Sequence, residues 1–332
     1  MSTAGAGTTA APGFRVGTRG SALAMTQTRT VADALAGTSA TSYELVRVKT
    51  EGDVTSGPLS QLGGTGVFAA ALRLSLLDGG CDVAVHSLKD LPTTQPDGLV
   101  IAATPARVDV RDALCARDGL RLDQLPDGAK VGTGSPRRGA QLKAARPDLQ
   151  IVDIRGNVGT RLGRVAGSVR PEDDGGVGRG VHGDLDAVVL AAAGLQRLGL
   201  AGHITEYLDP EIMLPAPGQG SLAVEVRSGG TGNAAVDAAL RELDDEPTRL
   251  AVTAERALLG RLEAGCAAPI GALARQVDGS LVLTTVVCAP DGSSTLRRSA
   301  TARTAGTEGA RDLGIRLAEE LLDAGAAELA GL

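Results

Sequence analysis

The run Thr133–Arg138 carries the strongest sequence signal for binding an anion. Ser135 can cap a helix whose first position is a proline, and the free backbone N–H groups of a helix start favour an anion. The hydroxyls of Thr133 and Ser135 would add donors. The guanidiniums of Arg137 and Arg138 can each hold a carboxylate or a phosphate in a fork. Because the spacing of a nucleotide P-loop is absent, we expect a site for another acidic ligand here.

A second basic turn comes after the next predicted strand. Arg155 and Asn157 follow that strand directly, and Arg161 comes about one helical turn later. The formal net charge is −6, so no overall basic field would draw an anion to the protein. Local arginine clusters must therefore bind the ligand, which should carry several negative groups.

Lys89 and Asp90 form a charged pair that admits two interpretations. They could make a surface salt bridge, worth at most about 1 kcal/mol. Alternatively, the Asp90 carboxylate could stabilise a cationic intermediate or transfer protons. The residue types alone leave both interpretations open.

Cys266 lies on a predicted turn after a helix, between Gly265 and Pro269. A buried structural thiol and an outward-facing reactive thiol both fit this position. No histidine lies nearby in the sequence to suggest a Cys–His pair. The histidines have no metal-ligand spacing and the cysteines form no C-x-x-C pair, so no metal site is expected. Thiol chemistry at Cys266 would therefore be covalent attachment rather than hydrolysis.

Alternating strand and helix patterns position these residues and predict α/β layers with largely parallel sheets. Helices are expected over 21–36 and 67–78 and after Ser135. Strands are expected at 14–18, 43–49, 82–86, 99–103, 129–133, 150–154, 186–191 and 221–226. Ligands of such folds bind beyond the carboxyl ends of strands. The polar residues that follow strand ends are Arg19, Ser21, Ser87, Lys89, Asp90, Thr133, Ser135, Arg137, Arg138 and Arg155.

The final third of the chain has a different pattern. An amphipathic helix is expected over 247–263 and a last helix over about 308–324. The strands between them are separated by Asp278-Gly279 and Asp291-Gly292, both of which are hairpin signals. We expect a small α+β domain with an antiparallel sheet.

Composition excludes several classes of protein. The first 13 residues lack the basic start and apolar stretch of a secretory signal and indicate a flexible tail. No apolar run approaches the length of a membrane helix. Two Phe, two Tyr and no Trp argue against stacking of single-stranded nucleic acid. We expect a cytoplasmic monomer that uses neither nucleic acid nor a membrane.

Six segments in chain order resemble the porphobilinogen deaminase (hydroxymethylbilane synthase) family. They are Thr18-Arg-Gly-Ser-Ala-Leu-Ala24, His86-Ser-Leu-Lys-Asp-Leu-Pro92, Val131-Gly-Thr-Gly-Ser-Pro-Arg-Arg138, Ile154-Arg-Gly-Asn-Val-Gly-Thr-Arg161, Leu214-Pro-Ala-Pro-Gly-Gln-Gly220 and Leu262-Glu-Ala-Gly-Cys266. Each segment alone is weak evidence, but six of them in the right order are very specific evidence for this family. The similarity runs from about residue 14 to the C-terminus.

The resemblance implies two α/β lobes like those of periplasmic binding proteins, facing each other across a cleft, plus a small C-terminal α+β domain. The implied organisation is a tail over 1–12, a first lobe over 13–105 plus 219–240, a second lobe over 106–218 with a loop insertion at about 167–183, and a third domain over 241–332. By the same resemblance, Cys266 holds a dipyrromethane cofactor through a thioether. Four molecules of the substrate, porphobilinogen, are then joined with loss of ammonia, and hydrolysis releases hydroxymethylbilane.

The resemblance also implies roles for single residues. Asp90 would assist the loss of ammonia and stabilise the electron-poor azafulvene that follows. Gln219 would lie in the hinge where the chain returns to the first lobe. The residues implied to bind acetate and propionate side chains are Arg19, Ser21, Ser87, Lys89, Thr133, Ser135, Arg137, Arg138, Arg155, Arg161 and Arg197.

Two departures from the family pattern are visible. Gln61 and Thr65 occupy places where many members carry lysines, and the 167–183 stretch is longer than expected.

Two rival functions would each explain part of this sequence. A two-lobed anion-binding protein would leave Cys266 and the Lys89-Asp90 pair without a purpose. A cysteine-dependent acyl-transfer enzyme would need a base beside Cys266 and fits the arginines poorly.

Overall fold

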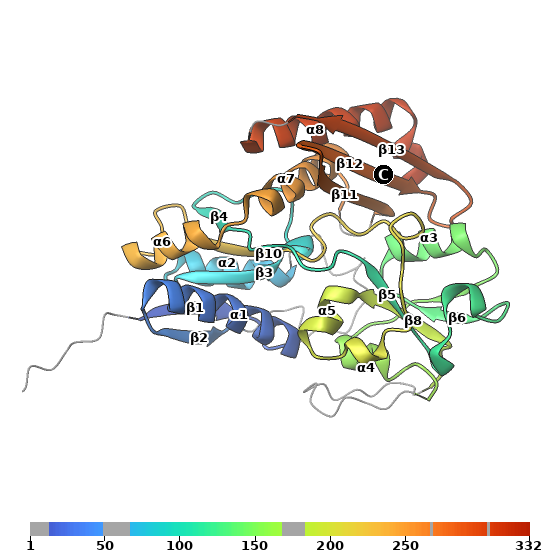
Figure 1. The fold of residues 1–332 in the computed structure, drawn as a ribbon, viewed down its shortest axis with the longest axis horizontal. Helices are drawn as coiled ribbons and strands as arrows, with labels where there is room; N and C mark the ends of the chain where they lie inside the picture. The colour runs from blue at the N-terminus through green and yellow to red at the C-terminus, as the bar shows by residue number, and fades with distance from the viewer. Residues whose placement is uncertain (1–12, 49–66, 168–182, 266–267, 304–305) are drawn as a thin grey trace, which may run out of the picture.

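A computed structural model describes residues 13–48, 67–167, 183–265, 268–303 and 306–332. The predicted tail, Gln61, Thr65, nearly all of the 167–183 insertion and Cys266 itself lie outside the described residues. Within the described residues the chain forms two five-stranded sheets and one three-stranded sheet. Figure 1 shows the first lobe in blue and cyan beside the second lobe in green and yellow, with the C-terminal domain in orange and red across the top.

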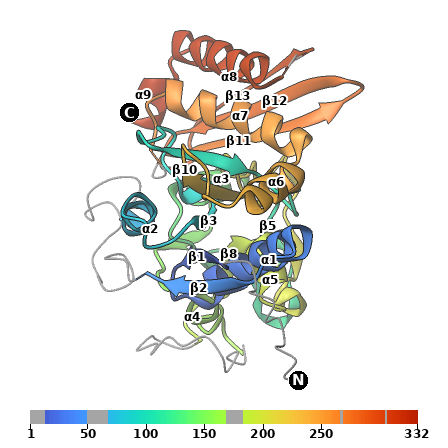
Figure 2. The same ribbon diagram turned by 90° about the vertical axis from the view of Figure 1, so that its left-hand side faces the viewer.

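The first lobe is a mixed sheet with helices on both faces. Its elements are β1 (Phe14–Thr18), α1 (Ala22–Ser39), β2 (Tyr43–Arg47), α2 (Val67–Leu77), β3 (Val83–Ser87), β4 (Leu99–Ala103), β10 (Leu222–Arg227) and α6 (Ala234–Leu243). The strand order is β2-β1-β3-β10-β4, and only β10 runs against its neighbours. Leu35 of α1 and Val236 of α6 pack into one core, whereas Leu72 and Leu76 of α2 pack into another. Figure 2 shows α1 and α2 on opposite sides of the sheet.

The second lobe repeats this plan. Its elements are β5 (Asp112–Ala116), β6 (Lys130–Gly132), α3 (Pro136–Ala145), β7 (Gln150–Val152), α4 (Val158–Leu162), β8 (Ala187–Ala191), α5 (Ala192–Arg197) and β9 (Glu206–Tyr207). The strand order is β7-β6-β8-β5-β9, with β5 antiparallel to β8 and β9. Short 3-10 helices cover Leu88–Asp90, Arg117–Gly119, Leu122–Gln124 and Ala201–His203.

Two connections join the lobes, and each leads into an antiparallel strand. Residues 104–111 run from β4 into β5, and residues 208–221 run from β9 back into β10. The strand β10 therefore belongs to the first sheet although it follows the second lobe in sequence. The expected largely parallel sheets are confirmed apart from these two inserted strands.

The C-terminal domain packs helices on an antiparallel sheet, as predicted. Its elements are α7 (Glu246–Arg261), β11 (Ile270–Val277), β12 (Ser280–Cys288), β13 (Thr295–Ala302), α8 (Gly306–Asp323) and α9 (Ala326–Ala330). Asp278 and Gly279 connect β11 to β12 with φ values of 48° and 72°, which is the backbone of the predicted tight hairpin. Leu258 of α7 and Leu317 of α8 are buried in the core of this domain.

The sequence patterns missed β5, β9, α5, α6 and α9, and one capping prediction was wrong. Ser135 occupies the N-cap position of α3, but its side chain caps nothing. Its backbone N–H donates instead to the Thr133 hydroxyl, at 3.2 Å. The residue type predicted the helix start correctly, whereas the rotamer depends on the surrounding fold. The domain boundaries given above remain a prediction.

Candidate active site

A central cavity of about 200 Å³ lies where both lobes and the C-terminal domain meet. We call it the central cavity throughout. Its lining residues are Lys89, Asp90, Gly134, Ser135, Arg137, Arg138, Arg161, Ala216, Pro217, Gln219, Leu259, Gly265, Ala268 and Ile270. Gly265 and Ala268 are the described residues on either side of the segment that holds Cys266. The fold therefore brings four of the predicted cationic residues, Lys89, Arg137, Arg138 and Arg161, and the neighbours of Cys266 to one space.

The carboxyl ends of the parallel strands deliver most of these side chains. The strand β3 ends at Ser87, and the turn Leu88–Asp90 follows it and presents Lys89 and Asp90. The strand β6 ends at Gly132, and Arg137 and Arg138 lie in the first turn of α3. Placement beyond strand ends was the sequence prediction, and the structure confirms it for these residues.

The buried carboxylate of Asp112 lies behind the arginines and was missed by the sequence analysis. It accepts from Arg137 Nη1 at 2.8 Å and from Arg138 Nε at 2.9 Å, and all three side chains are nearly or wholly buried. Burial alone would raise the pKa of the Asp112 carboxyl, but the charges of Arg137 and Arg138 outweigh it and hold that pKa well below its usual range. Asp112 is thus the fixed counterion that allows two guanidiniums to remain buried beside the central cavity.

Gln219 connects this charge cluster to the first lobe. Its side-chain amide donates to Asp112 at 3.0 Å and to the Val110 carbonyl at 2.8 Å. Its side-chain oxygen accepts from Lys89 Nζ at 3.4 Å. Burial and the nearby charge of Arg138 lower the pKa of Lys89 to about 8. One buried amide in the second connection therefore joins a residue of each lobe.

The charges around the central cavity favour an anionic ligand. Lys89, Arg137, Arg138 and Arg161 are opposed by the carboxylates of Asp90 and of the buried Asp112. Asp90 is exposed, and it makes no ion pair within the part of the chain that the structure describes. The surface salt bridge considered for Lys89 and Asp90 is therefore not what positions this carboxylate.

Six of the predicted binding residues do not line the central cavity. Ser21 caps α1, since its hydroxyl accepts from Ala24 N at 3.3 Å. Ser87 donates to Gln27, and Arg197 donates to the Gly220 carbonyl at 2.9 Å. The other three are Arg19, Thr133 and Arg155. Thr133 is buried, and Arg155 Nε lies 3.9 Å from Asp153 Oδ2.

Glu255 is a second buried acid that the sequence analysis missed. It accepts from Arg107 Nη1 at 2.6 Å, from Gly218 N at 2.6 Å and from Ala274 N at 2.8 Å. The available sequence signal was an acid on the otherwise apolar face of α7, and for Asp112 it was an acid at the start of a short apolar run. Neither pattern indicates a partner.

The three cysteines among the described residues are buried. Cys81, Cys115 and Cys288 are free thiols, and burial raises the pKa of Cys115 to about 12 and that of Cys288 to about 11. The described residues contain no His, Cys, Asp and Glu cluster suited to a metal ion. Nor does any helix among them have the length and apolar character needed to cross a bilayer.

Comparison with known proteins finds similar sequences over nearly the whole chain. Residues 14–235 match the family model described as "Porphobilinogen deaminase, dipyromethane cofactor binding domain", and residues 249–323 match "Porphobilinogen deaminase, C-terminal domain". The porphobilinogen deaminase of Micrococcus luteus is 60% identical over 304 residues, which cover 86% of this chain and 81% of the relative. That of Cutibacterium acnes is 54% identical over 330 residues, covering 96% and 97%.

Among solved structures, a periplasmic substrate-binding protein from Coxiella burnetii is similar over 69% of this chain and 91% of its own. The two sequences are 15% identical and the TM-score is 0.42.

Proposed function

The chain belongs to the porphobilinogen deaminase family, and we propose that it joins four porphobilinogen molecules on a dipyrromethane carried by Cys266, then releases hydroxymethylbilane by hydrolysis. As a member of this family it is a transferase of tetrapyrrole synthesis, with a dipyrromethane cofactor-binding domain over residues 14–235. The proposal includes a cytoplasmic monomer that uses neither nucleic acid nor a membrane.

The composition of the central cavity is the observation that supports this proposal most directly. Four cationic side chains line a space that also contacts Gly265 and Ala268, the neighbours of the Cys266 segment. A pyrrole bearing acetate and propionate groups presents two carboxylates per ring, and guanidiniums hold carboxylates in a fork. The donor set therefore fits a polycarboxylate tethered at Cys266.

When bound, the dipyrromethane would supply the free pyrrole carbon to which the first substrate unit is joined. Lys89, Arg137, Arg138 and Arg161 would hold carboxylates along the central cavity. Asp112 keeps two of these arginines in place, so their donors are already oriented before a ligand arrives. Because these arginine side chains are already oriented, they need to move little when a ligand binds.

Asp90 has the environment that its proposed role needs. Its exposed carboxylate lines the central cavity among cationic residues. The Asp90 carboxylate would stabilise positive charge that develops near a pyrrole nitrogen and would assist the loss of ammonia from porphobilinogen. We propose that the remaining predicted residues act at the same edge of the two sheets: Arg19, Ser21, Ser87, Thr133, Ser135, Arg155, Arg197 and Gln219.

Three of the four cysteines are poor candidates for the attachment point. Cys81, Cys115 and Cys288 are buried, and burial raises the pKa of each thiol, which suppresses the reactive thiolate. Cys266 is the remaining thiol, and its described neighbours line the central cavity.

The proposal is tested by the intact mass of the purified protein, measured beside Cys266→Ala and, as a matched control, Cys115→Ala. We expect the wild type and Cys115→Ala to carry an excess mass of two linked pyrrole units, and Cys266→Ala to carry none. The modified proteins should then consume porphobilinogen. A wild-type chain that is unmodified and takes up no porphobilinogen would overturn the proposal.

A further inference from the structure

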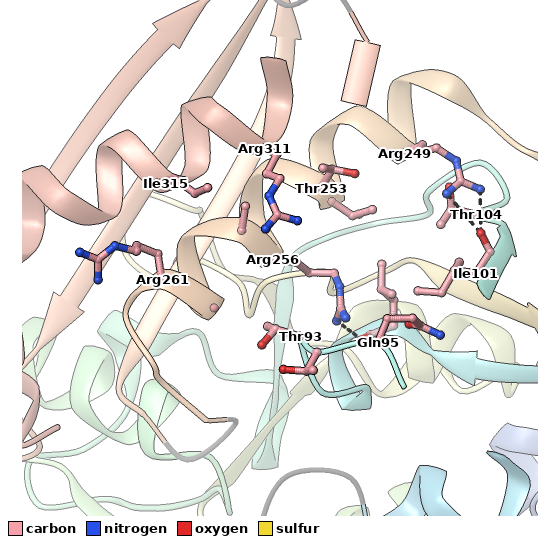
Figure 3. A pocket seen from close by; sticks show the side chains of 15 residues that line it. Thr93, Gln95, Ile101, Thr104, Arg249, Thr253, Arg256, Arg261, Arg311 and Ile315 are labelled. Carbon is pink, nitrogen blue, oxygen red and sulfur yellow. Dashed lines mark hydrogen bonds between the residues drawn. The ribbon is translucent and has the colours of Figure 1, made fainter. Parts of the chain in front are cut away.

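A second and larger cavity, of about 640 Å³, lies between the first lobe and the C-terminal domain. We call it the α7–α8 cavity. Figure 3 shows Arg311 entering it from α8, Thr253 and Arg256 from α7, and Thr93 and Gln95 from the facing loop. Its volume is in the range of small-molecule sites. None of its lining residues lines the central cavity.

The helix α7 supplies seven of the 15 residues that line this cavity. Arg249, Thr253, Arg256 and Gly260 recur at helical spacing on one face of this helix, and Gly260 contributes no side chain that would fill the space. Leu259 lies on another face and lines the central cavity. The same helix therefore separates the two cavities.

The charges of the α7–α8 cavity favour an anion. Its lining contains Arg249, Arg256, Arg261 and Arg311, and no carboxylate among the described residues lines it. Arg249 is paired with Asp244 and Arg261 with Glu319. Arg311 is exposed and makes no ion pair within the described part of the chain. Because Arg249 and Arg261 are neutralised from outside the cavity, the exposed Arg311 is the cation that offers its charge to a ligand, and Arg256 adds a second guanidinium to the lining.

The rest of the lining is a mixture of apolar side chains and hydroxyls. Ile101, Val252 and Ile315 offer apolar surface, and the hydroxyls of Thr93 and Thr253 can donate or accept hydrogen bonds. An apolar wall with a few convergent charged groups is the usual composition of a site for an organic anion. A small inorganic ion would leave most of this volume unfilled.

Arg256 connects the α7–α8 cavity to the turn that carries Lys89 and Asp90. It donates from Nη1 to the Leu91 carbonyl at 3.0 Å and from Nη2 to the Pro92 carbonyl at 2.5 Å, with a longer bond to the Leu88 carbonyl. These carbonyls belong to and follow the turn that carries Lys89 and Asp90. A ligand held by Arg256 would therefore be linked through one side chain to the turn that serves the central cavity.

We propose that the α7–α8 cavity is a second ligand site, for an organic anion with an aromatic or otherwise apolar body, and that its occupancy restrains the Leu88–Pro92 turn. The acidic group would lie between Arg256 and Arg311, and the body would cover Ile101, Val252 and Ile315. The site is distinct from that of the proposed reaction, and its existence does not depend on that reaction.

The test is a fluorescence titration of the holoenzyme with 8-anilinonaphthalene-1-sulfonate, an aromatic anion of this class. Arg311→Gln removes the exposed cation of the site, and Arg316→Gln removes an exposed arginine of the same helix that does not line the cavity. We expect saturable binding to the wild type and an affinity at least about tenfold weaker in Arg311→Gln, because one charge-assisted hydrogen bond is lost. The affinity of Arg316→Gln should equal that of the wild type. Non-saturable binding, or equal affinity in Arg311→Gln and wild type, would overturn the site.

Hydrogen exchange of the same samples tests the link to the turn. The Leu91 amide donates to the Leu88 carbonyl within this turn. We expect the probe to slow exchange at Leu91 in the wild type and in Arg316→Gln, and to have a weaker effect in Arg311→Gln at the same concentration. Unchanged exchange at Leu91 under saturating probe would overturn the link while leaving the binding result to decide the site.

Discussion

At the scale of single residues, the central cavity shows how a protein of net charge −6 can concentrate cations. Asp112 is wholly buried and contacts Arg137, Arg138 and Gln219. Removing such a carboxylate would leave buried guanidiniums without a counterion, a change that typically costs about 3–5 kcal/mol. The two buried arginines that line the cavity therefore depend on an acid that does not itself line it.

Lys89 leads to a prediction about pH. Its pKa is lowered to about 8, so it is charged below that pH and becomes neutral as the pH rises through it. The charged form binds carboxylates better, and the KM for porphobilinogen should therefore rise, by up to about tenfold, as the pH passes 8. In Lys89→Arg the guanidinium stays charged, and this rise should disappear.

The measurement is KM as a function of pH for the wild type, Lys89→Arg and Lys130→Arg. Lys130 is an exposed lysine on β6 and serves as the control, which should keep the wild-type profile. A Lys89→Arg profile that matches the wild type would show that another group titrates.

At the scale of elements, the two connections between the lobes must pass very close to each other. Gly220 has φ 88°, and a Cβ at this position would lie 2.8 Å from the Val108 carbonyl oxygen and 3.1 Å from that of Asp109. Both neighbours are backbone atoms of the first connection and cannot rotate away. Glycine at this position is thus required both by the backbone conformation and by the close approach.

Gly220→Ala should lower the free energy of unfolding by about 2–4 kcal/mol, because the strained backbone and the clash both contribute. Gly199→Ala is the matched control, since Gly199 has φ 71° but no atom within 4 Å of its added Cβ. The free energy of unfolding of Gly199→Ala should fall by only about 1 kcal/mol. Denaturant unfolding measures both, and equal losses would mean that the close approach does not matter.

At the scale of the whole molecule, one buried carboxylate joins the C-terminal domain to both connections. Glu255 of α7 accepts from Arg107 in the first connection, from Gly218 in the second and from Ala274 of β11. Arg107 also donates to the Gln219 carbonyl at 2.8 Å. The position of the C-terminal domain relative to the two connections thus depends on this junction.

Glu255→Gln should lower the free energy of unfolding by about 3–5 kcal/mol, because the largely buried guanidinium of Arg107 loses its counterion. Hydrogen exchange at Gly218 and Ala274 should become faster as their acceptor weakens. Glu319→Gln removes a half-exposed acid on α8 and should cost less than about 1 kcal/mol. If both variants unfold alike, the junction is not what holds the domain in place.

The sequence by itself determined the elements whose signals are local. Buried runs such as Val83–Ser87 and the Asp278-Gly279 turn depend on side-chain alternation and on φ preferences, which neighbouring residues reveal. The start of α3 and the polar residues after each parallel strand were predicted for the same reason. Six ordered motifs predicted the family, and the comparisons confirm it.

Only the tertiary structure decided which distant residues meet. β5 is a short strand of five residues, and nothing in it indicates that Asp112 will pair with Ala191 and lie beneath two arginines of α3. The α7–α8 cavity likewise requires α7, α8 and the loop after β3 to be placed together. Local propensity depends on adjacent residues, whereas these contacts depend on strand order and domain packing, which no pattern along a single chain contains.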